Sequence, residues 1–316
     1  MKKIYWVLLF VGFFLFKSPY FSQAQSDWVR YRYEIIGGIG PTFFLGELGG
    51  NDGIGQNNIL DLDWGATRVG GHVGMRYFVQ QRLAVQASFT FGFIHGSDKN
   101  TNEFYRNYRD ISFRSPIYEL HGRIEYKIRK ERPGHRYDLK GVRGRRAVKL
   151  VTYAFVGVGV FYFNPQAQID GSWINLQPIG TEGQNFMKTR KPYSRVAMSI
   201  PCGFQFKYLA NRYWAFSFEV GPRFLFTDYL DDVSTTYASP DKIAEHQNRV
   251  PDYVAKLLAD PAYESNIRPS TGGGLTYGYY NEQRGDPYDN DFYMFAMISV
   301  HYKLKAKRNG WPTFQK

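Results

Sequence analysis

Alternation of apolar and polar residues recurs in eight segments of the chain. In residues 112–128, Tyr118 and Leu120 share one face while Glu119 and His121 share the other. Successive side chains of a β-strand point to opposite sides, so this period predicts strands rather than helices. The predicted strands cover residues 31–43, 67–79, 82–94, 112–128, 150–163, 194–209, 212–226 and 291–304.

The lengths of these segments and of their connections distinguish a membrane barrel from a soluble sandwich. The segments have 13–17 residues, whereas strands of soluble proteins usually have about 5–6. Short and long connections alternate, as in barrels with short periplasmic turns and long outer loops. The short ones are 80–81 and 210–211, and the long ones are 44–66, 95–111, 164–193 and 227–290. One connection breaks this rule, since 129–149 is long where a short periplasmic turn is expected, and we interpret it as an insertion. We therefore predict an all-β fold, an eight-stranded antiparallel transmembrane β-barrel with long extracellular loops.

The first 24 residues have the pattern of a secretory signal peptide. Lys2 and Lys3 precede an apolar run over 4–16, and Ser22-Gln23-Ala24 offers a small-x-small cleavage site. The alternative is an uncleaved anchor, but the run is shorter than the roughly 20 residues of a spanning helix. Residues 25–316 then form one barrel domain, predicted in a Gram-negative outer membrane with both termini periplasmic.

Composition narrows the class further. Of the 316 residues only one is Cys, which excludes a disulfide framework. Aromatic residues make up 18% of the chain, too many for a disordered protein. The net charge is +12. Nucleic acid is not expected as the partner of these basic residues, because the chain is predicted to lie in the cell envelope.

Charged residues are predicted to fill the barrel. The interior of an eight-stranded barrel is just wide enough for side chains, and charges of both signs can pair there. We therefore expect a closed lumen and no conducting pore. The strand over 150–163 is apolar or glycine on both faces, so its orientation stays open. The residues expected to point inward are Arg68, His72, Arg76, Arg82, Glu119, His121, Arg123, Glu125, Glu219 and Arg223.

The connection 227–290 is predicted to form an outer cap with two short helices. Ser239-Pro240-Asp241 is a plausible helix start, and residues 253–258 could form a second helix. Clustered carboxylates precede them, which suggests either a calcium site or local turns that bond backbone amides; we favour turns. These carboxylates are Asp228, Asp231 and Asp232.

The chain lacks a recognisable catalytic motif. A hydrolase could be assembled from Ser199 or Ser299 with His72, His121 or His301 and Glu119, but no G-x-S-x-G elbow is present. Pairing of the histidines with neighbouring carboxylates is the simpler interpretation. We predict a protein without enzymatic activity, bound cofactor or metal.

The connection 129–149 is strongly basic. Its charge suggests binding to anionic lipid headgroups or to an acidic periplasmic partner; the third interpretation is a solvated turn. The tail, with Lys303, Lys305, Lys307 and Arg308, is predicted at the same end. The candidate partner-binding residues are Arg129, Lys130, Arg132, Arg136, Lys140, Arg143, Arg145 and Arg146.

Several segments resemble a known family. They include LQPIGTEGQ (176–184), FTDYLDDVSTTY (226–237) and RGDPYDNDFYMFAMISVHYKL (284–304). With ISFRSPIYELHGRIEY (111–126), YAFVGVGVFYFNP (153–165) and PCGFQFKY (201–208), they are similar to the PorG-like outer-membrane β-barrel family of Bacteroidetes. The resemblance runs from about residue 33 to 304.

This resemblance implies a barrel associated with the type IX secretion system and no catalytic residues. The implied partners are outer-membrane lipids, a periplasmic ring lipoprotein and associated secretion subunits. We therefore expect a structural component that anchors the ring through residues 129–149. A surface-exposed adhesion or ligand-binding barrel acting through its outer loops is the alternative, and a lipid-modifying enzyme ranks third.

Overall fold

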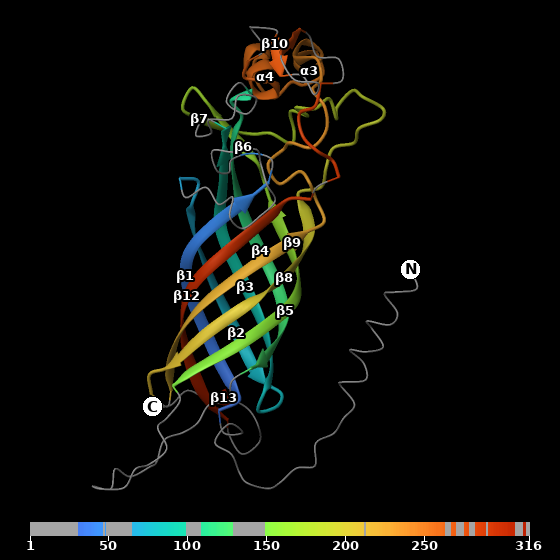
Figure 1. The fold of residues 1–316 in the computed structure, drawn as a ribbon. Helices are drawn as coiled ribbons and strands as arrows, with labels where there is room; N and C mark the ends of the chain where they lie inside the picture. Colours follow the sequence, from blue (N-terminus) through green and yellow to red (C-terminus); the bar gives the residue numbers. More distant parts are fainter. Residues whose placement is uncertain are drawn as a thin grey trace, which may run out of the picture.

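The computed structural model of the chain contains a closed, eight-stranded antiparallel β-barrel, which confirms the predicted fold (Figure 1). Each strand pairs with its sequence neighbour in the wall, and β1 pairs with β12 to close the ring. The structure describes residues 31–46, 48, 65–98, 109–128, 149–211, 213–262, 267–269, 275–277, 282–288, 290–306 and 312–313.

The wall strands lie close to the predicted segments, within about three residues at each end. The connection between β2 and β3 and that between β8 and β9 are short, as predicted. The strands are β1 (Tyr33–Leu45), β2 (Arg68–Phe78), β3 (Leu83–Ser97), β4 (Ser112–Lys127), β5 (Leu150–Phe163), β8 (Val196–Leu209), β9 (Trp214–Leu225) and β12 (Phe292–Ala306).

The polarity of the wall is the reverse of that in a water-soluble protein. In β3, Val85, Phe89 and Phe91 are exposed on the outside, whereas Gln86 and Ser88 are buried inside. β4, β8 and β9 follow the same rule, and all the wall strands expose apolar side chains on the outside, so an apolar belt surrounds the barrel. A membrane-spanning barrel needs this arrangement, since lipid faces the outside of its wall. No helix among the described residues is both long and apolar enough to cross a membrane.

The structure decides the orientation of β5. Val151, Tyr153 and Phe161 point inward and are buried, whereas Val156 and Val158 are exposed on the outer surface. Both faces are apolar because one meets the outer environment and the other packs against apolar layers inside the barrel. Polarity alone could not distinguish these faces.

One predicted inward residue lies elsewhere. Arg82 occupies the short turn before β3, is exposed, and donates a hydrogen bond to the Tyr126 hydroxyl at 3.2 Å. The prediction that it points into the lumen was therefore wrong. The predicted strand began at residue 82, one residue before the observed start of β3 at Leu83.

The two ends of the barrel differ in construction. Short turns lie at the end where β1 begins and β12 ends; the opposite end carries the cap (Figure 1). The hairpin of β6 (Gln166–Ile169) and β7 (Ser172–Asn175) extends from the cap end, and it was not predicted. The expected helices are present as α3 (Pro240–Glu245) and α4 (Asp252–Ala259). Short strands β10 (Ile267–Pro269), β11 (Leu275–Tyr277) and β13 (Pro312–Thr313) complete the description.

Candidate functional site

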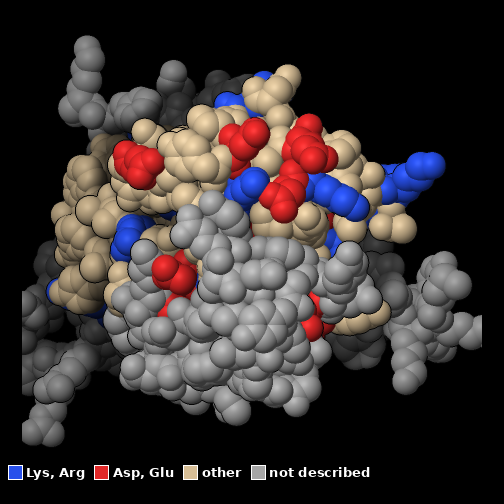
Figure 2. All heavy atoms as spheres, turned by 90° about the horizontal axis from the view of Figure 1, so that it is seen from above, with Lys and Arg blue, Asp and Glu red and all other residues tan. Residues whose placement is uncertain are grey.

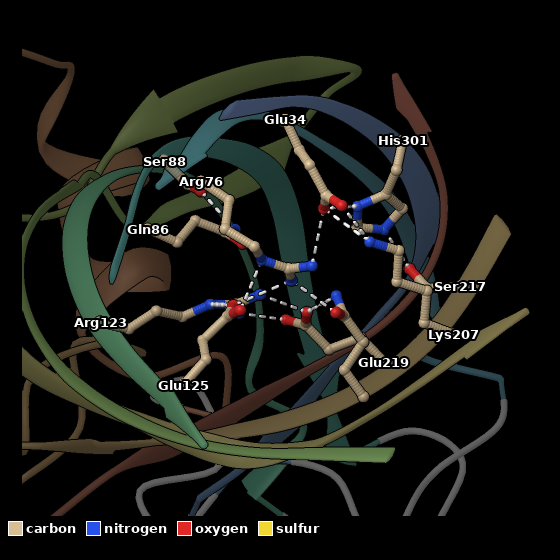
Figure 3. Close-up of polar contacts among 11 residues, drawn as sticks. Glu34, Arg76, Gln86, Ser88, Arg123, Glu125, Lys207, Ser217, Glu219 and His301 are labelled. Carbon is tan, nitrogen blue, oxygen red and sulfur yellow. Dashed lines mark hydrogen bonds and ion pairs between the residues drawn. The ribbon is translucent and has the colours of Figure 1, made fainter. Parts of the chain in front are cut away.

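A network of buried charges crosses the lumen, and Glu34 on β1 lies at one side of it (Figure 3). Lys207 Nζ lies 2.6 Å from both carboxylate oxygens of Glu34. Arg76 on β2 donates to the same carboxylate at 3.1 Å. The neighbouring strands β1 and β2 and the distant strand β8 thus meet at one carboxylate, which receives charge-assisted hydrogen bonds from two cations.

Arg76 links this group to a second one. Its guanidinium lies 2.5 Å from Glu125 and also donates to the Gln205 amide oxygen at 2.5 Å. Glu125 in turn accepts from Arg123 at 2.8 Å. Arg123 donates to both oxygens of Glu219 at 2.6 Å, the bidentate geometry that fixes direction as well as distance.

A third group lies towards the cap around Glu119. Ser199 donates to Glu119 at 2.6 Å and Arg223 donates at 3.3 Å. The Nδ1 atom of His121 lies 3.4 Å from the same carboxylate. The structure therefore brings together the predicted inward residues Glu119, His121, Arg123, Glu125, Glu219 and Arg223.

The network is balanced in charge and enclosed by apolar layers. Its four carboxylates, Glu34, Glu119, Glu125 and Glu219, face four cations, Arg76, Arg123, Lys207 and Arg223. At the short-turn end the lumen contains the apolar cluster of Phe78, Ala84, Val151 and Tyr153, and the buried Lys127 Nζ lies 5.2 Å from the centroid of the Phe78 ring. At the cap end a larger cluster fills it, including Phe44, Phe113, Phe161, Phe163, Tyr293 and Phe295. Charges paired between two apolar layers make a filled interior rather than a water-lined channel.

Two members of the network escaped the sequence analysis, Glu34 and Lys207. In β1, Glu34 shares its face with Ile36, Gly38 and Gly40, while the other face holds Ile35 and Ile39. Both faces of β1 therefore look apolar, and one acid does not reveal which side is inward. A signal for Lys207 was present, since Gln205 and Ser199 share its face of β8.

The lumen also contains a serine, a histidine and a glutamate whose side chains lie in a row in space. Ser217 Oγ lies 2.7 Å from His301 Nε2, and His301 Nδ1 lies 3.5 Å from Glu34 Oε2. These residues are 4%, 0% and 0% exposed, so a substrate could reach Ser217 only through an opened barrel. The contact to Glu34 is too long for the oriented hydrogen bond that a hydrolytic triad requires, and Lys207 already holds that carboxylate.

The residues considered for a hydrolase are arranged differently from that scheme. Ser199 donates directly to Glu119 rather than to a histidine. Ser299 Oγ lies 3.3 Å from His72 Nε2. In both places the serine takes part in packing the lumen.

The base of the cap has a polar core that joins distant segments. Arg284 pairs with Glu182 at 3.1 Å, and both side chains are buried. Glu182 also accepts hydrogen bonds from the amides of Ser234 and Thr235 at 2.9 and 3.1 Å. The segment 176–184 is thereby fixed to the segment 226–237, and residue 284 is fixed to both.

Above this polar core, α3 and α4 pack into an apolar cluster of their own. Ile243, Val254 and Leu258 are buried there against Leu176 and Ile179 of the preceding loop. The cap is therefore a folded unit, and its upper surface carries acidic side chains interspersed with basic ones (Figure 2).

The three candidate ion ligands of the cap serve other contacts. Asp232 accepts from the Tyr193 hydroxyl at 2.6 Å and from the Thr181 hydroxyl, and it faces Arg284. Asp231 accepts from the Val233 amide at 2.9 Å, the local turn that was favoured. Among the described residues no group of three or more acids, histidines or cysteines is arranged to hold a metal ion.

The third carboxylate, Asp228, gives the cap a predicted pH dependence. Burial, with Asp231, Glu182 and Asp286 nearby, raises the pKa of Asp228 to about 8. Burial also raises the pKa of Asp232 to about 6 against the effect of Arg284. The folded cap then holds protons that an unfolded cap releases at its ordinary Asp pKa. This contribution to stability is complete below about pH 4 and is lost as the pH rises through 6 and then 8.

We expect the protection factors of the amides in α3 and α4 to fall by about one order of magnitude or more between pH 5 and pH 9. Hydrogen exchange measured by mass spectrometry, corrected for the intrinsic exchange rate, tests this. Asp228→Asn should flatten the upper part of the profile, whereas Asp170→Asn at the exposed hairpin tip should not. Equal profiles for the wild type and Asp228→Asn would contradict the assignment.

Residues 129–148 lie outside the described residues, so the predicted partner-binding set of the basic turn has no structural description. Lys149, which ends that connection, is exposed directly before β5. The connection leaves the barrel at the short-turn end, the end opposite the cap.

Comparison with known proteins matches solved barrels but no family model and no curated protein. Neisserial surface protein A matches with a TM-score of 0.36 and 7% identity over 86% of this chain and 96% of that one. The attachment invasion locus protein Ail of Yersinia pestis matches with a TM-score of 0.37 and 9% identity over 86% and 98%. Outer membrane protein W of E. coli matches with a TM-score of 0.29 and 13% identity over 86% and 98%. These scores are low, and the assignment of the fold to an eight-stranded barrel therefore rests on the strand pairings of this chain.

Proposed function

We propose that this chain is a non-conducting outer-membrane β-barrel that acts as a structural anchor through its short-turn end. The observation that carries the proposal is the filled lumen, in which paired charges lie between two apolar layers. With its interior occupied, the barrel offers no route for a solute. The apolar belt supports a membrane location, because such a belt is costly in water.

The anchored partner that we propose is the periplasmic ring of the type IX secretion machinery. The resemblance of residues 176–184, 226–237 and 284–304 to the PorG-like family supports this choice. The basic connection 129–149 is the proposed docking element, since eight of its residues between 129 and 146 are the cations named above. In this orientation the short-turn end lies in the periplasm and the cap lies outside the cell.

The test is affinity purification of the tagged full chain from mildly solubilised outer membranes. We expect the wild type to recover a periplasmic lipoprotein at near-stoichiometric yield. Replacing the eight basic residues of 129–146 with glutamine should reduce that yield about tenfold or more, since each surface contact adds modestly and the set acts together. A gel of heated and unheated samples shows whether the barrel stays folded.

A matched control neutralises exposed basic residues of the cap instead. Lys188, Lys191, Lys242 and Arg249 are exposed there, and their replacement with glutamine should leave the recovery unchanged. A folded wild-type barrel recovered alone would contradict the anchor proposal.

The alternative is a surface barrel that binds a ligand or another cell through its cap. The observation that favours it is the construction of the cap, which has its own apolar cluster and buried ion pairs. A simple connecting loop needs neither. Loss of a captured partner in the cap variant, with the basic-turn variant unaffected, would favour this alternative.

A further inference from the structure

The outer wall at the cap end carries a cation beside aromatic rings, on the side that faces away from the lumen. Arg114 lies on β4 between Phe113 and Ser115, which are both buried inside the barrel. Alternation therefore places Arg114 on the outer face, in line with exposed Tyr118 and Leu120. It lies four residues before Tyr118 on β4, towards the cap end of this exposed apolar face.

The guanidinium of Arg114 is held flat against an aromatic ring. Its Cζ atom lies 3.6 Å from the centroid of Trp173 on β7 and 6.0 Å from that of Phe93 on β3. Trp173 and Phe93 are themselves 38% and 45% exposed. Stacking restricts the orientation of the guanidinium, and tryptophan is enriched at membrane interfaces.

Arg114 also lacks an acidic partner among the described residues, in contrast to the cations of the network in the lumen. One Nη group donates to the Gln166 amide oxygen at 3.1 Å, and Nε is buried without a hydrogen-bond partner in the described part of the chain. The remaining donors on the two Nη atoms are therefore the ones that an external anion would contact. A cation that is stacked, oriented and unpaired is complementary to an anion supplied from outside the protein.

A row of amide side chains connects Arg114 to a second guanidinium. Gln166 and Asn164 both donate to the Asn175 side-chain oxygen at 2.8 Å. Asn164 in turn accepts from Arg195 at 3.4 Å, and Arg195 lies 5.7 Å from the ring centroid of Tyr162. The same end of the wall thus presents two guanidinium groups, each beside an aromatic ring.

We infer that this outer rim binds the phosphate headgroup of an anionic glycolipid of the outer leaflet, with Arg114 and Trp173 as the principal contacts. The inference rests on the membrane location and orientation in the proposed function. Phosphate accepts the bidentate hydrogen bonds that a guanidinium offers. The acyl chains of the lipid would lie along the exposed face of β3 and β4, against Phe91, Tyr118 and Leu120.

The experiment uses the purified full chain in neutral detergent micelles and native mass spectrometry with bisphosphorylated lipid A as the probe. We expect the wild type to retain this lipid, and Arg114→Gln to bind it about tenfold more weakly. Arg82→Gln is the control, since Arg82 is an exposed arginine that bonds to an aromatic residue, Tyr126, at the opposite end of the barrel. That variant should bind lipid A as the wild type does.

Further probes distinguish the sources of phosphate. Dephosphorylated lipid A, phosphatidylglycerol and inorganic phosphate should each bind more weakly than lipid A. Equal binding of any of them, or equal losses in Arg114→Gln and Arg82→Gln, would overturn the site. If Arg114→Gln does not fold, Trp173→Leu removes the stacking contact and makes the same test.

Failure of this site can be told apart from failure of the proposed function. A wild-type chain that does not insert into lipid vesicles as a heat-modifiable barrel would contradict the membrane proposal. A chain that inserts but does not discriminate lipid A would contradict the glycolipid site alone.

Discussion

Replacing Glu219 with leucine is expected to lower the free energy of unfolding of the barrel by about 3–5 kcal/mol. Arg123 donates to both oxygens of Glu219 at 2.6 Å, and the residues are 4% and 2% exposed. Removing the acid leaves a guanidinium buried with one remaining carboxylate, Glu125. Urea unfolding of the barrel in detergent micelles, followed by tryptophan fluorescence, measures the change.

The double variant Arg123→Met/Glu219→Leu is the informative control. It removes both charges and fills the space with apolar side chains of similar size, which often restores or improves stability. We expect it to be more stable than Glu219→Leu alone by about 2 kcal/mol or more. The single variant Arg123→Met completes the cycle. If its loss and that of Glu219→Leu simply add in the double variant, the two residues do not act as a buried ion pair and the closed-lumen interpretation fails.

The parts of the fold that sequence could predict are those in which one face of a strand differs from the other. In β4, Glu119, Arg123 and Glu125 mark the inward face against Tyr118 and Leu120, so both the strand and its orientation could be predicted. In β5 both faces are apolar, because the inward side chains of Val151 and Phe161 belong to the layers that close the lumen. Polarity therefore located that strand without orienting it.

The candidate sites were less accessible because they depend on contacts between distant residues. Arg284 meets Glu182 across 102 positions in the sequence, and the pairing of Lys207 with Glu34 spans 173. No local period reports such a contact. The contact at the outer rim could not be predicted either. Trp173 belongs to the β6–β7 hairpin, which was not predicted, and without that hairpin Trp173 cannot be placed beside Arg114.

Three of the segments on which the resemblance was based, 176–184, 226–237 and 284–304, meet in the structure. Thr181 and Glu182 of the first bond to Asp232 and Ser234 of the second, and Arg284 of the third bonds to Glu182. A buried, mutually satisfied cluster accepts few substitutions, because each loss leaves an unpaired polar group. The particular amino-acid sequences of these segments are therefore explained by the folding of the cap base, without a contribution from a partner.

The seam that closes the barrel is the position where a small change should have the largest effect. Between β1 and β12 the register runs regularly from Tyr33 to Ile39 and resumes at Thr42. Gly40 and Pro41 lie in this gap. Pro41 has no N–H to donate to β12, and the side of the Gly40 Cα that would carry a Cβ atom faces the backbone of β12. A Cβ atom at residue 40 would overlap the carbonyl oxygen of Ala296.

We therefore expect Gly40→Ala to destabilise the barrel by at least about 3 kcal/mol, because a backbone carbonyl cannot move aside without opening the seam. Gly37→Ala is the matched control on the same strand, since no atom lies within 4 Å of the Cβ position there. Refolding into micelles, scored by the heat-modifiable band on a gel, should give little folded protein for Gly40→Ala and a normal yield for Gly37→Ala. Equal yields for the two would mean that the seam tolerates separation of β1 and β12. The closure of the wall would then depend on the charges inside the lumen, where Glu34 of β1 is bound to Lys207 and Arg76, rather than on close contact between the two strands.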